Sequence, residues 1–165
     1  MTRALLRLAL TAVSLAINIV AMPAAAQSAT ASFQVSANVL PICTISATAI
    51  DFGNYDPVLA NDTVAADQTG TLTIRCTRGT AWSVVLDAGG NFLGTRRMRL
   101  GATAEHLAYD LYSDPGRIVP WGAVPQIGIA ASRAPFALTV YGRVPAGQDA
   151  VAGAYLDSVI ATVTF

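Results

Sequence analysis

The amino-acid sequence predicts an all-β sandwich. Short runs alternate apolar and polar residues, and in a strand such alternation places the apolar side chains on one face. Turn-forming Gly, Pro, Asn and Asp residues separate these runs at short intervals. After residue 26 no helical periodicity continues beyond a turn or two. Many short strands joined by turns are typical of a sandwich.

The first 26 residues predict a signal peptide that is cleaved before Gln27. Arg3 and Arg7 precede an apolar run, and the small residues 24–26 suit the cleavage site. The run falls short of the roughly 20 apolar residues that span a bilayer, so a retained anchor is the weaker interpretation. Removing 26 of the 165 residues leaves 139, which is the size of one exported domain.

The segment Phe33–Val39 predicts the first strand of the mature chain. Its apolar residues alternate with polar ones and form one row: Phe33, Val35, Ala37 and Val39. Two interpretations remain open. The strand could pair within its own sheet, or it could be donated to the groove of a neighbouring subunit.

The two cysteines, Cys43 and Cys76, predict a disulfide, because an even number of cysteines in an exported chain usually pairs. Cys43 begins the short predicted strand Cys43–Ser46. In the predicted strand Thr69–Thr77, alternation places Cys76 on the buried face. Closing a loop of about 34 residues would stabilise the fold by roughly 3–4 kcal/mol.

The middle of the chain predicts further strands and loops. Ile50–Pro57 is expected to run along the sandwich edge, before a polar loop at Asn61–Gln68. Because charge on an edge strand discourages stray pairing, the arginines at 96, 97 and 99 favour a solvated edge over a ligand patch. The predicted strands are Trp82–Leu86, Arg96–Leu100, Leu107–Tyr112 and Phe136–Arg143.

The last predicted strand is Tyr155–Phe165. Its apolar face carries Tyr155, Val159, Ala161, Val163 and Phe165. With no strand after Phe165, this strand is expected to gain no following partner from its own chain.

Residues that carry chemistry are sparse. His106 and Glu105 are the single histidine and glutamate, adjacent in a predicted loop, and no nucleophile motif accompanies them. No spacing fits a metal site or a phosphate-binding loop. Eight arginines against ten acidic residues after cleavage argue against nucleic acid as a partner. We therefore expect no enzyme, no catalytic residues, no cofactor, no metal and no small-molecule substrate.

The order of several short motifs resembles the spore coat protein U domain family, whose members include pilins of archaic chaperone–usher pili. The resemblance covers essentially the whole mature chain. It rests on Cys43-Thr44-Ile45, Phe52-Gly53-x-Tyr55, Ile74-x-Cys76, Arg97-Met98, Leu107-x-Tyr109-x-Leu111-Tyr112, Trp121-Gly122, Tyr141-Gly142-x-Val144-Pro145 and Val163-Thr164-Phe165.

The resemblance implies an immunoglobulin-like β-sandwich that lacks its last strand. Residues 1–26 would be the signal peptide, 27–40 a donor-strand extension and 41–165 the sandwich domain. A periplasmic chaperone would lend a strand, and an outer-membrane usher would exchange it for the N-terminal strand of a neighbouring copy or related pilin. The expected function is a structural subunit of a surface pilus, exported through the periplasm, that supports attachment and biofilm formation.

A different class of function also fits the sequence. The chain could be a monomeric secreted coat or surface-associated binding domain, in which Phe33–Val39 pairs within its own sheet. Exposed Tyr112 and Trp121 could then contact a carbohydrate. The competing interpretation makes these two aromatic residues part of the core or groove.

Overall fold

The computed structural model describes residues 25–122 and 124–165, so nearly all of the predicted signal peptide lies outside the described residues. The chain divides into two compact units, residues 1–37 and 38–165. In the first unit, residues 25–37 form no helix or strand and are all exposed. No helix in the described part of the chain has the length and hydrophobicity needed to cross a membrane.

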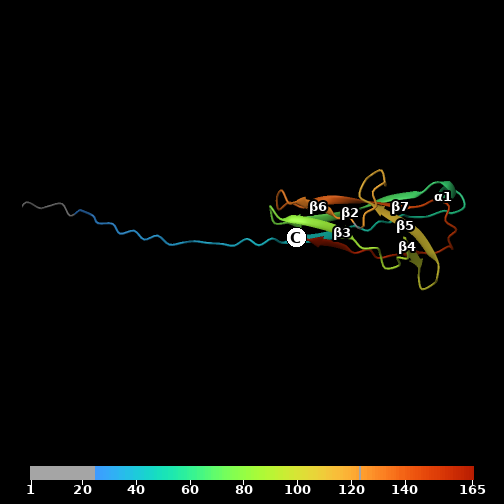
Figure 1. The fold of residues 1–165 in the computed structure, drawn as a ribbon, viewed down its shortest axis with the longest axis horizontal. Helices are drawn as coiled ribbons and strands as arrows, with labels where there is room; N and C mark the ends of the chain where they lie inside the picture. The colour runs from blue at the N-terminus through green and yellow to red at the C-terminus, as the bar shows by residue number, and fades with distance from the viewer. Residues whose placement is uncertain (1–24, 123) are drawn as a thin grey trace, which may run out of the picture. The chain divides into compact units, whose positions relative to one another are not determined.

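The second unit is a sandwich of two antiparallel sheets, which confirms the predicted fold class (Figure 1). The six-stranded sheet has the order β1-β2-β7-β5-β4-β8 and the three-stranded sheet the order β6-β3-β9. One short helix, α1 (Ala60–Thr63), precedes β2. The strands are β1 (Cys43–Ala47), β2 (Ala66–Cys76), β3 (Ala81–Leu86), β4 (Arg96–Leu100), β5 (His106–Tyr112), β6 (Gln126–Ile129), β7 (Phe136–Val144), β8 (Tyr155–Leu156) and β9 (Ala161–Thr164).

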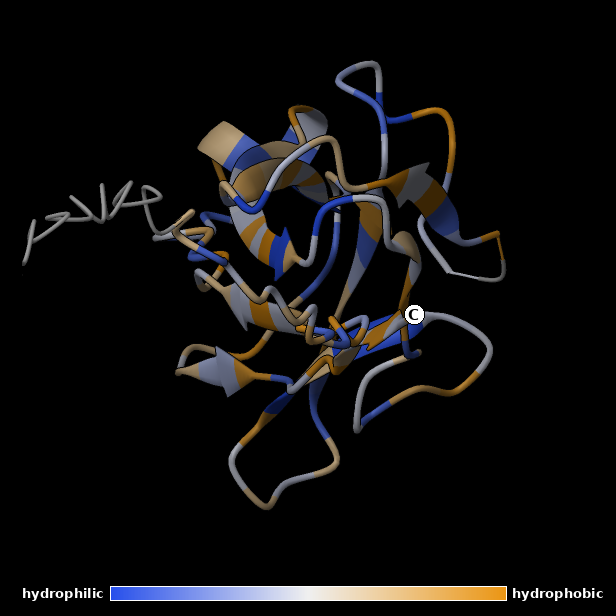
Figure 2. Cartoon of the chain, turned by 90° about the vertical axis from the view of Figure 1, so that its left-hand side faces the viewer, coloured by the Kyte–Doolittle hydropathy of each residue, from blue (hydrophilic) through white to orange (hydrophobic). Residues whose placement is uncertain are grey.

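Most strands form where apolar and polar residues alternate in the sequence, and Figure 2 shows this banding along them. β2 begins earlier than predicted, because Ala66 pairs with Val144 at the far end of β7. The predicted loop Asn61–Gln68 therefore contains most of α1 and the first residues of β2. Residues 50–57 form no strand. Tyr55 anchors this segment instead, since its hydroxyl donates a 2.8 Å hydrogen bond to the carbonyl of Pro145.

The predicted last strand is wrong as a single element. Tyr155 and Leu156 form β8 beside β4 in the large sheet, whereas Ala161–Thr164 forms β9 beside β3 in the small sheet. The chain crosses between the sheets at Asp157. Its carboxylate accepts hydrogen bonds from Asn91 and Tyr109, so it holds the crossing in place.

The structure also corrects three single-residue expectations. Arg96 is buried, and its Nη2 donates a 3.0 Å hydrogen bond to the carbonyl of Trp121, so β4 is not evenly solvated. β4 is flanked by the short β8 and is not the last strand of its sheet. His106 begins β5 instead of lying in a loop. Trp121 is buried in the core and cannot stack on a carbohydrate, while Tyr112 is half-buried.

The core lies between the sheets and is not equally deep throughout. Ile74, Val84 and Val144 are completely buried. Apolar side chains that pack against this core from β1, β9 and the first half of β7 are only partly buried. The sandwich is therefore well closed along β5 and the end of β7, and thinly covered near β1 and β9.

Candidate functional site

The candidate site is the seam between β1 and β9, one strand from each sheet. β1 pairs with β2 alone and β9 pairs with β3 alone among the described residues. The two strands approach within 8 Å between Cα atoms, yet no ladder joins them. Each strand therefore presents one row of backbone N–H and C=O groups without a strand partner, which is the feature that a further strand can pair with.

Apolar side chains face this seam from both strands. Ile45 of β1 and the β9 residues Ala161 and Val163 point toward the core but remain partly exposed. Val159, just before β9, packs against the core in the same partly buried way. Ile45 lies in register with Ile74, which is fully covered, so burial falls sharply from β2 to the seam.

An open apolar hollow of about 450 Å³ lies beside β9, over the small sheet. Phe165 forms part of its wall and is 54% exposed. Of the predicted groove residues on β9 and after it, Phe165 lines this hollow, whereas Ala161 and Val163 pack against the core and do not line it. The hollow is lined by Ala81, Trp82, Ser83, Ile127, Gly128, Ile129, Thr164 and Phe165.

The sequence analysis did not identify β6 as part of this hollow. Ile127 and Ile129 are 75% and 70% exposed and flank Gly128. A side chain at Gly128 would meet the Trp82 ring, since an added Cβ would clash with its Cζ2. The sequence Ile127-Gly128-Ile129 alternates as a short strand does. The Pro and Gly residues around it instead favoured the prediction of a loop connection.

The apolar row predicted as a strand is unpaired in the structure. Phe33 and Val35 are 86% and 83% exposed, and Val39 is 78% exposed. Ala37 is likewise exposed, and residues 25–42 contain no strand.

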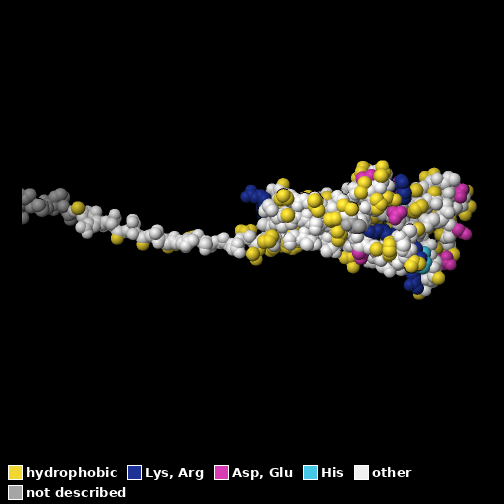
Figure 3. Space-filling view, viewed as in Figure 1, with side chains coloured by type: hydrophobic (Ala, Val, Ile, Leu, Met, Phe, Trp, Pro, Cys, Tyr) yellow, Lys and Arg dark blue, Asp and Glu magenta, His cyan; other side chains and the backbone are white. Residues whose placement is uncertain are grey.

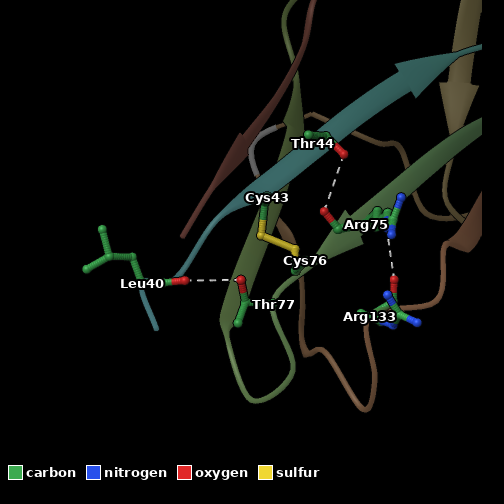
Figure 4. The surroundings of a disulfide bond; sticks show 7 residues. All are labelled: Leu40, Cys43, Thr44, Arg75, Cys76, Thr77 and Arg133. Atoms are coloured by element: carbon green, nitrogen blue, oxygen red, sulfur yellow. Dashed lines mark hydrogen bonds between the residues drawn. A yellow bond between two sulfur atoms is a disulfide. The ribbon is translucent and has the colours of Figure 1, made fainter. Parts of the chain in front are cut away.

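The chain just before β1 is held against the end of β2. The carbonyl of Ile42 accepts a 2.9 Å hydrogen bond from the Thr77 backbone N–H. The carbonyl of Leu40 accepts a 3.1 Å bond from the Thr77 hydroxyl (Figure 4). Residues 40–42 therefore continue in line with β1 along the β2 side.

Cys43 and Cys76 form the predicted disulfide (Figure 4). They are directly opposite one another in the β1–β2 ladder, with their Cα atoms 4.1 Å apart. The bond fastens the first residue of β1 to a buried position of β2. The opposite edge of β1 borders the seam.

The adjacent residues Glu105 and His106 lie at the start of β5. Glu105 is exposed just before the strand, and His106 is half-buried as its first residue. Among the described residues, no three His, Cys, Asp or Glu side chains come together as metal ligands.

These features define a disulfide-linked β-sandwich domain with free strand edges at one seam. The chain belongs to the Spore Coat Protein U domain family, because the family model matches residues 29–162. It is 37% identical to Protein U of Myxococcus xanthus over 97% of this chain and 98% of that protein.

Solved structures are similar to this chain to different degrees. One is the crystal structure of the CsuC–CsuE chaperone–tip adhesion subunit pre-assembly complex from archaic chaperone–usher Csu pili of Acinetobacter baumannii, with TM-score 0.56 and 22% identity. That match covers 77% of this chain but only 40% of the solved chain. Another is the E. coli Hda pilus minor tip subunit HdaB, with TM-score 0.40 and 21% identity over 72% of this chain and 78% of that one.

Proposed function

We propose that this protein is a structural subunit of an archaic chaperone–usher pilus and polymerises by donor-strand exchange. Residues 27–40 are the donor extension and 41–165 the acceptor domain. The row Phe33, Val35, Ala37 and Val39 enters the seam of a neighbouring copy or related pilin. There it meets the groove residues Val159, Ala161, Val163 and Phe165.

The observation that carries this proposal is that an exposed apolar row and an open seam are complementary. An alternating apolar row lies exposed in one segment, and a seam with partly buried apolar side chains and free strand edges lies in the sandwich. Burying the four side chains of the row would contribute on the order of 1 to 2 kcal/mol each, with alanine at or below the lower limit. Pairing with the free backbone groups adds to this.

The hydrogen bonds of Thr77 favour exchange between chains over self-insertion. They direct residues 40–42 past the end of β2, whereas insertion into the chain's own seam needs a reversal within those residues. A donor that leaves its own domain makes a head-to-tail contact, and such contacts propagate as filaments.

The width of the seam supports a role for a chaperone. A strand paired to both β1 and β9 would hold them roughly 9.5 Å apart, which is two strand spacings. The strands of the lone chain approach within 8 Å, so the seam must widen to accept a donor. A periplasmic chaperone that lends a strand would keep it open until an outer-membrane usher directs the exchange. The chaperone in the similar solved complex is in keeping with this partner.

The same proposal accounts for the localisation of the protein. The disulfide fits an oxidising compartment outside the cytoplasm. A subunit exported through the periplasm and assembled at the cell surface acts by structure, in attachment and biofilm formation, and not as an enzyme.

Deleting residues 27–39 from the mature chain tests the proposal. The mature chain should form rods visible by electron microscopy or require the chaperone to stay soluble. The deletion variant should not polymerise and should still bind the chaperone. A peptide of residues 27–39, added to the deletion variant, should raise its Tm. A truncated subunit that still polymerises contradicts the proposal, and so does a mature chain that is a stable monomer without partners.

A pair of single substitutions gives the matched control. Val35→Asp places a charge on the apolar row, whereas Ser36→Asp places the same charge on the opposite face of the strand. The first should abolish polymerisation and the second should largely preserve it. Equal loss in both variants would mean that the row does not enter an apolar groove.

A further inference from the structure

A second surface of the sandwich carries an open polar hollow of about 480 Å³ that the proposed polymerisation does not use. It lies on the face of β4 and β5, between two turns. Its cationic and hydrogen-bonding side chains are Arg97, Arg99, His106, Asn91 and Thr103, and the ring of Phe92 completes the wall.

Register explains why the polar side chains of the hollow converge. Arg99 is directly opposite His106 in the β4–β5 ladder, and Arg97 lies two residues before Arg99 on the same face. Opposite residues of an antiparallel pair have their Cβ atoms roughly 5 Å apart. Figure 3 shows the histidine, in cyan, beside arginine side chains in dark blue.

Backbone carbonyls hold both guanidinium groups in place. Arg97 Nε donates to the carbonyl of Asn91 at 3.1 Å. Arg99 donates through Nε to the carbonyl of Thr103 at 2.8 Å, and through Nη2 to that of Ala102 at 2.7 Å. Several N–H donors of each guanidinium remain available, because arginine carries five.

Within the described residues, neither Arg97 nor Arg99 forms an ion pair. The ion pairs in this part of the chain join Asp67 to Arg117 and to Arg143. The positive charges of Arg97 and Arg99 are therefore not neutralised by an ion pair within the described part of the chain. An anionic ligand supplies the missing charge, and guanidinium groups bind carboxylate and sulfate-like oxygens in pairs.

Phe92 indicates what kind of anion fits. Its ring is 49% exposed at the wall of the hollow, where it can pack against the C–H face of a sugar ring. An open hollow admits a length of chain and does not enclose a small molecule. The domain as a whole is close to neutral. Nucleic acid binding needs many positive charges along the phosphate backbone, so this charge balance disfavours nucleic acid as the ligand.

We propose that this hollow binds acidic glycans, with the sugar ring on Phe92 and its carboxylate or sulfate group on Arg97 and Arg99. The site belongs to the single subunit and does not depend on polymerisation. In a filament it would recur once per subunit, so weak individual binding would combine into avidity.

The test measures calorimetric binding, per subunit, of the full mature chain to short oligosaccharides. The probes are an oligogalacturonate, a heparin-derived oligosaccharide, a neutral maltodextrin of equal length and a duplex DNA of equal charge. We expect binding to one or both acidic glycans, and the comparison identifies carboxylate or sulfate as the preferred group. Equal binding of DNA would show attraction by charge alone, and equal binding of maltodextrin would show no role for the arginines. Either result overturns the proposal.

The variants locate the site. Arg97→Gln with Arg99→Gln should weaken binding about tenfold or more, as expected from losing charge-assisted hydrogen bonds. Phe92→Ala, which removes no hydrogen bond, should weaken it several-fold. Arg78→Gln with Arg133→Gln also removes two positive charges, from exposed residues outside the hollow, and should leave binding unchanged. Unchanged glycan binding by the Arg97→Gln, Arg99→Gln variant overturns the proposal. If that variant also self-associates, the role of the two arginines is to prevent unwanted pairing at a strand edge.

Discussion

The hydroxyl of Tyr109 donates a 2.6 Å hydrogen bond to Oδ2 of Asp157. Tyr109 is buried on β5 of the large sheet, and Asp157 lies where the chain leaves that sheet for β9. Oδ1 of the same carboxylate accepts bonds from the backbone and side chain of Asn91. One carboxylate therefore ties the large sheet, a turn after β3 and the start of the groove strand together.

Replacing Tyr109 by Phe should lower the free energy of unfolding by about 1–2 kcal/mol, because Asp157 loses a partner in a partly buried position. Urea denaturation measures this loss. Tyr141→Phe is the control, since the Tyr141 hydroxyl forms no hydrogen bond in the described part of the chain. A loss of equal size in both variants would contradict a specific role for the Tyr109–Asp157 bond.

Alkaline pH should destabilise the protein through the same tyrosine. Burial raises the pKa of Tyr109 above its ordinary value of 10.0, and the hydrogen bond to Asp157 raises it further. The protonated phenol is thus favoured in the folded state. Its stabilising effect is complete below pH 10 and is lost as the pH rises toward the folded pKa. Tyr109→Phe should show a smaller fall in Tm above pH 10, and an identical fall would refute this assignment.

Reducing the disulfide should cost roughly 3–4 kcal/mol of stability, since Cys43 and Cys76 are 33 residues apart and the bond restricts the unfolded chain. Urea titrations with and without a thiol reductant measure the difference. A double Cys→Ser variant should match the reduced protein and show no effect of the reductant. If the reduced protein unfolds at the same urea concentration as the oxidised one, the expectation fails.

Gly128→Ala should displace Trp82 and loosen the small sheet. The added Cβ would clash with the Trp82 ring, whose centroid lies 4.9 Å from that of the Phe136 ring. We expect changed tryptophan fluorescence and a lower Tm. At Gly90 an added Cβ meets its nearest atom at 3.6 Å, an ordinary contact, so Gly90→Ala is the control. An unchanged Tm for Gly128→Ala would mean that the ring has room to move.

Acid should remove a small contribution from Asp67. The bidentate hydrogen bonds from Arg143, 2.7 Å each, lower the pKa of Asp67 below its ordinary value of 3.8, and nearby Arg117 acts in the same direction. The charged form is favoured in the folded state, so this stability is present above pH 3.8 and lost as pH falls through the folded pKa.

The pair is solvent-accessible, so its effect should be below about 1 kcal/mol. Arg143→Gln should therefore be slightly less stable than the parent at pH 6, and the difference should vanish near pH 2. A difference that persists unchanged at pH 2 would assign the effect to packing of the Arg143 side chain.

Residues whose pattern is local were predictable from the sequence. The strands β2, β5 and β7 of the large sheet alternate apolar and polar residues, and an exported chain with two cysteines predicts their pairing. The apolar character of Ala161 and Val163 likewise follows from alternation, and both face the seam. These features need no knowledge of distant contacts.

Features set by tertiary contacts were not predictable. The split of residues 155–165 into β8 and β9 depends on Asp157 meeting Tyr109 and Asn91, which are far away in sequence. Apolar residues recur at every second position on both sides of Asp157, so in the sequence Asp157 looks like a single polar interruption of one strand. Arg96 follows the same rule: its neighbours are solvated, but pairing of β4 with β5 turns its side chain toward Trp121.

The position of the disulfide has a mechanical consequence. The bond joins the first residue of β1 to β2, which pairs with β7 along most of its length. Tension applied to the chain ahead of Cys43 passes through a covalent link into an interior strand. The outermost strand then cannot be peeled away from its exposed end, and extension of the domain under load must begin elsewhere.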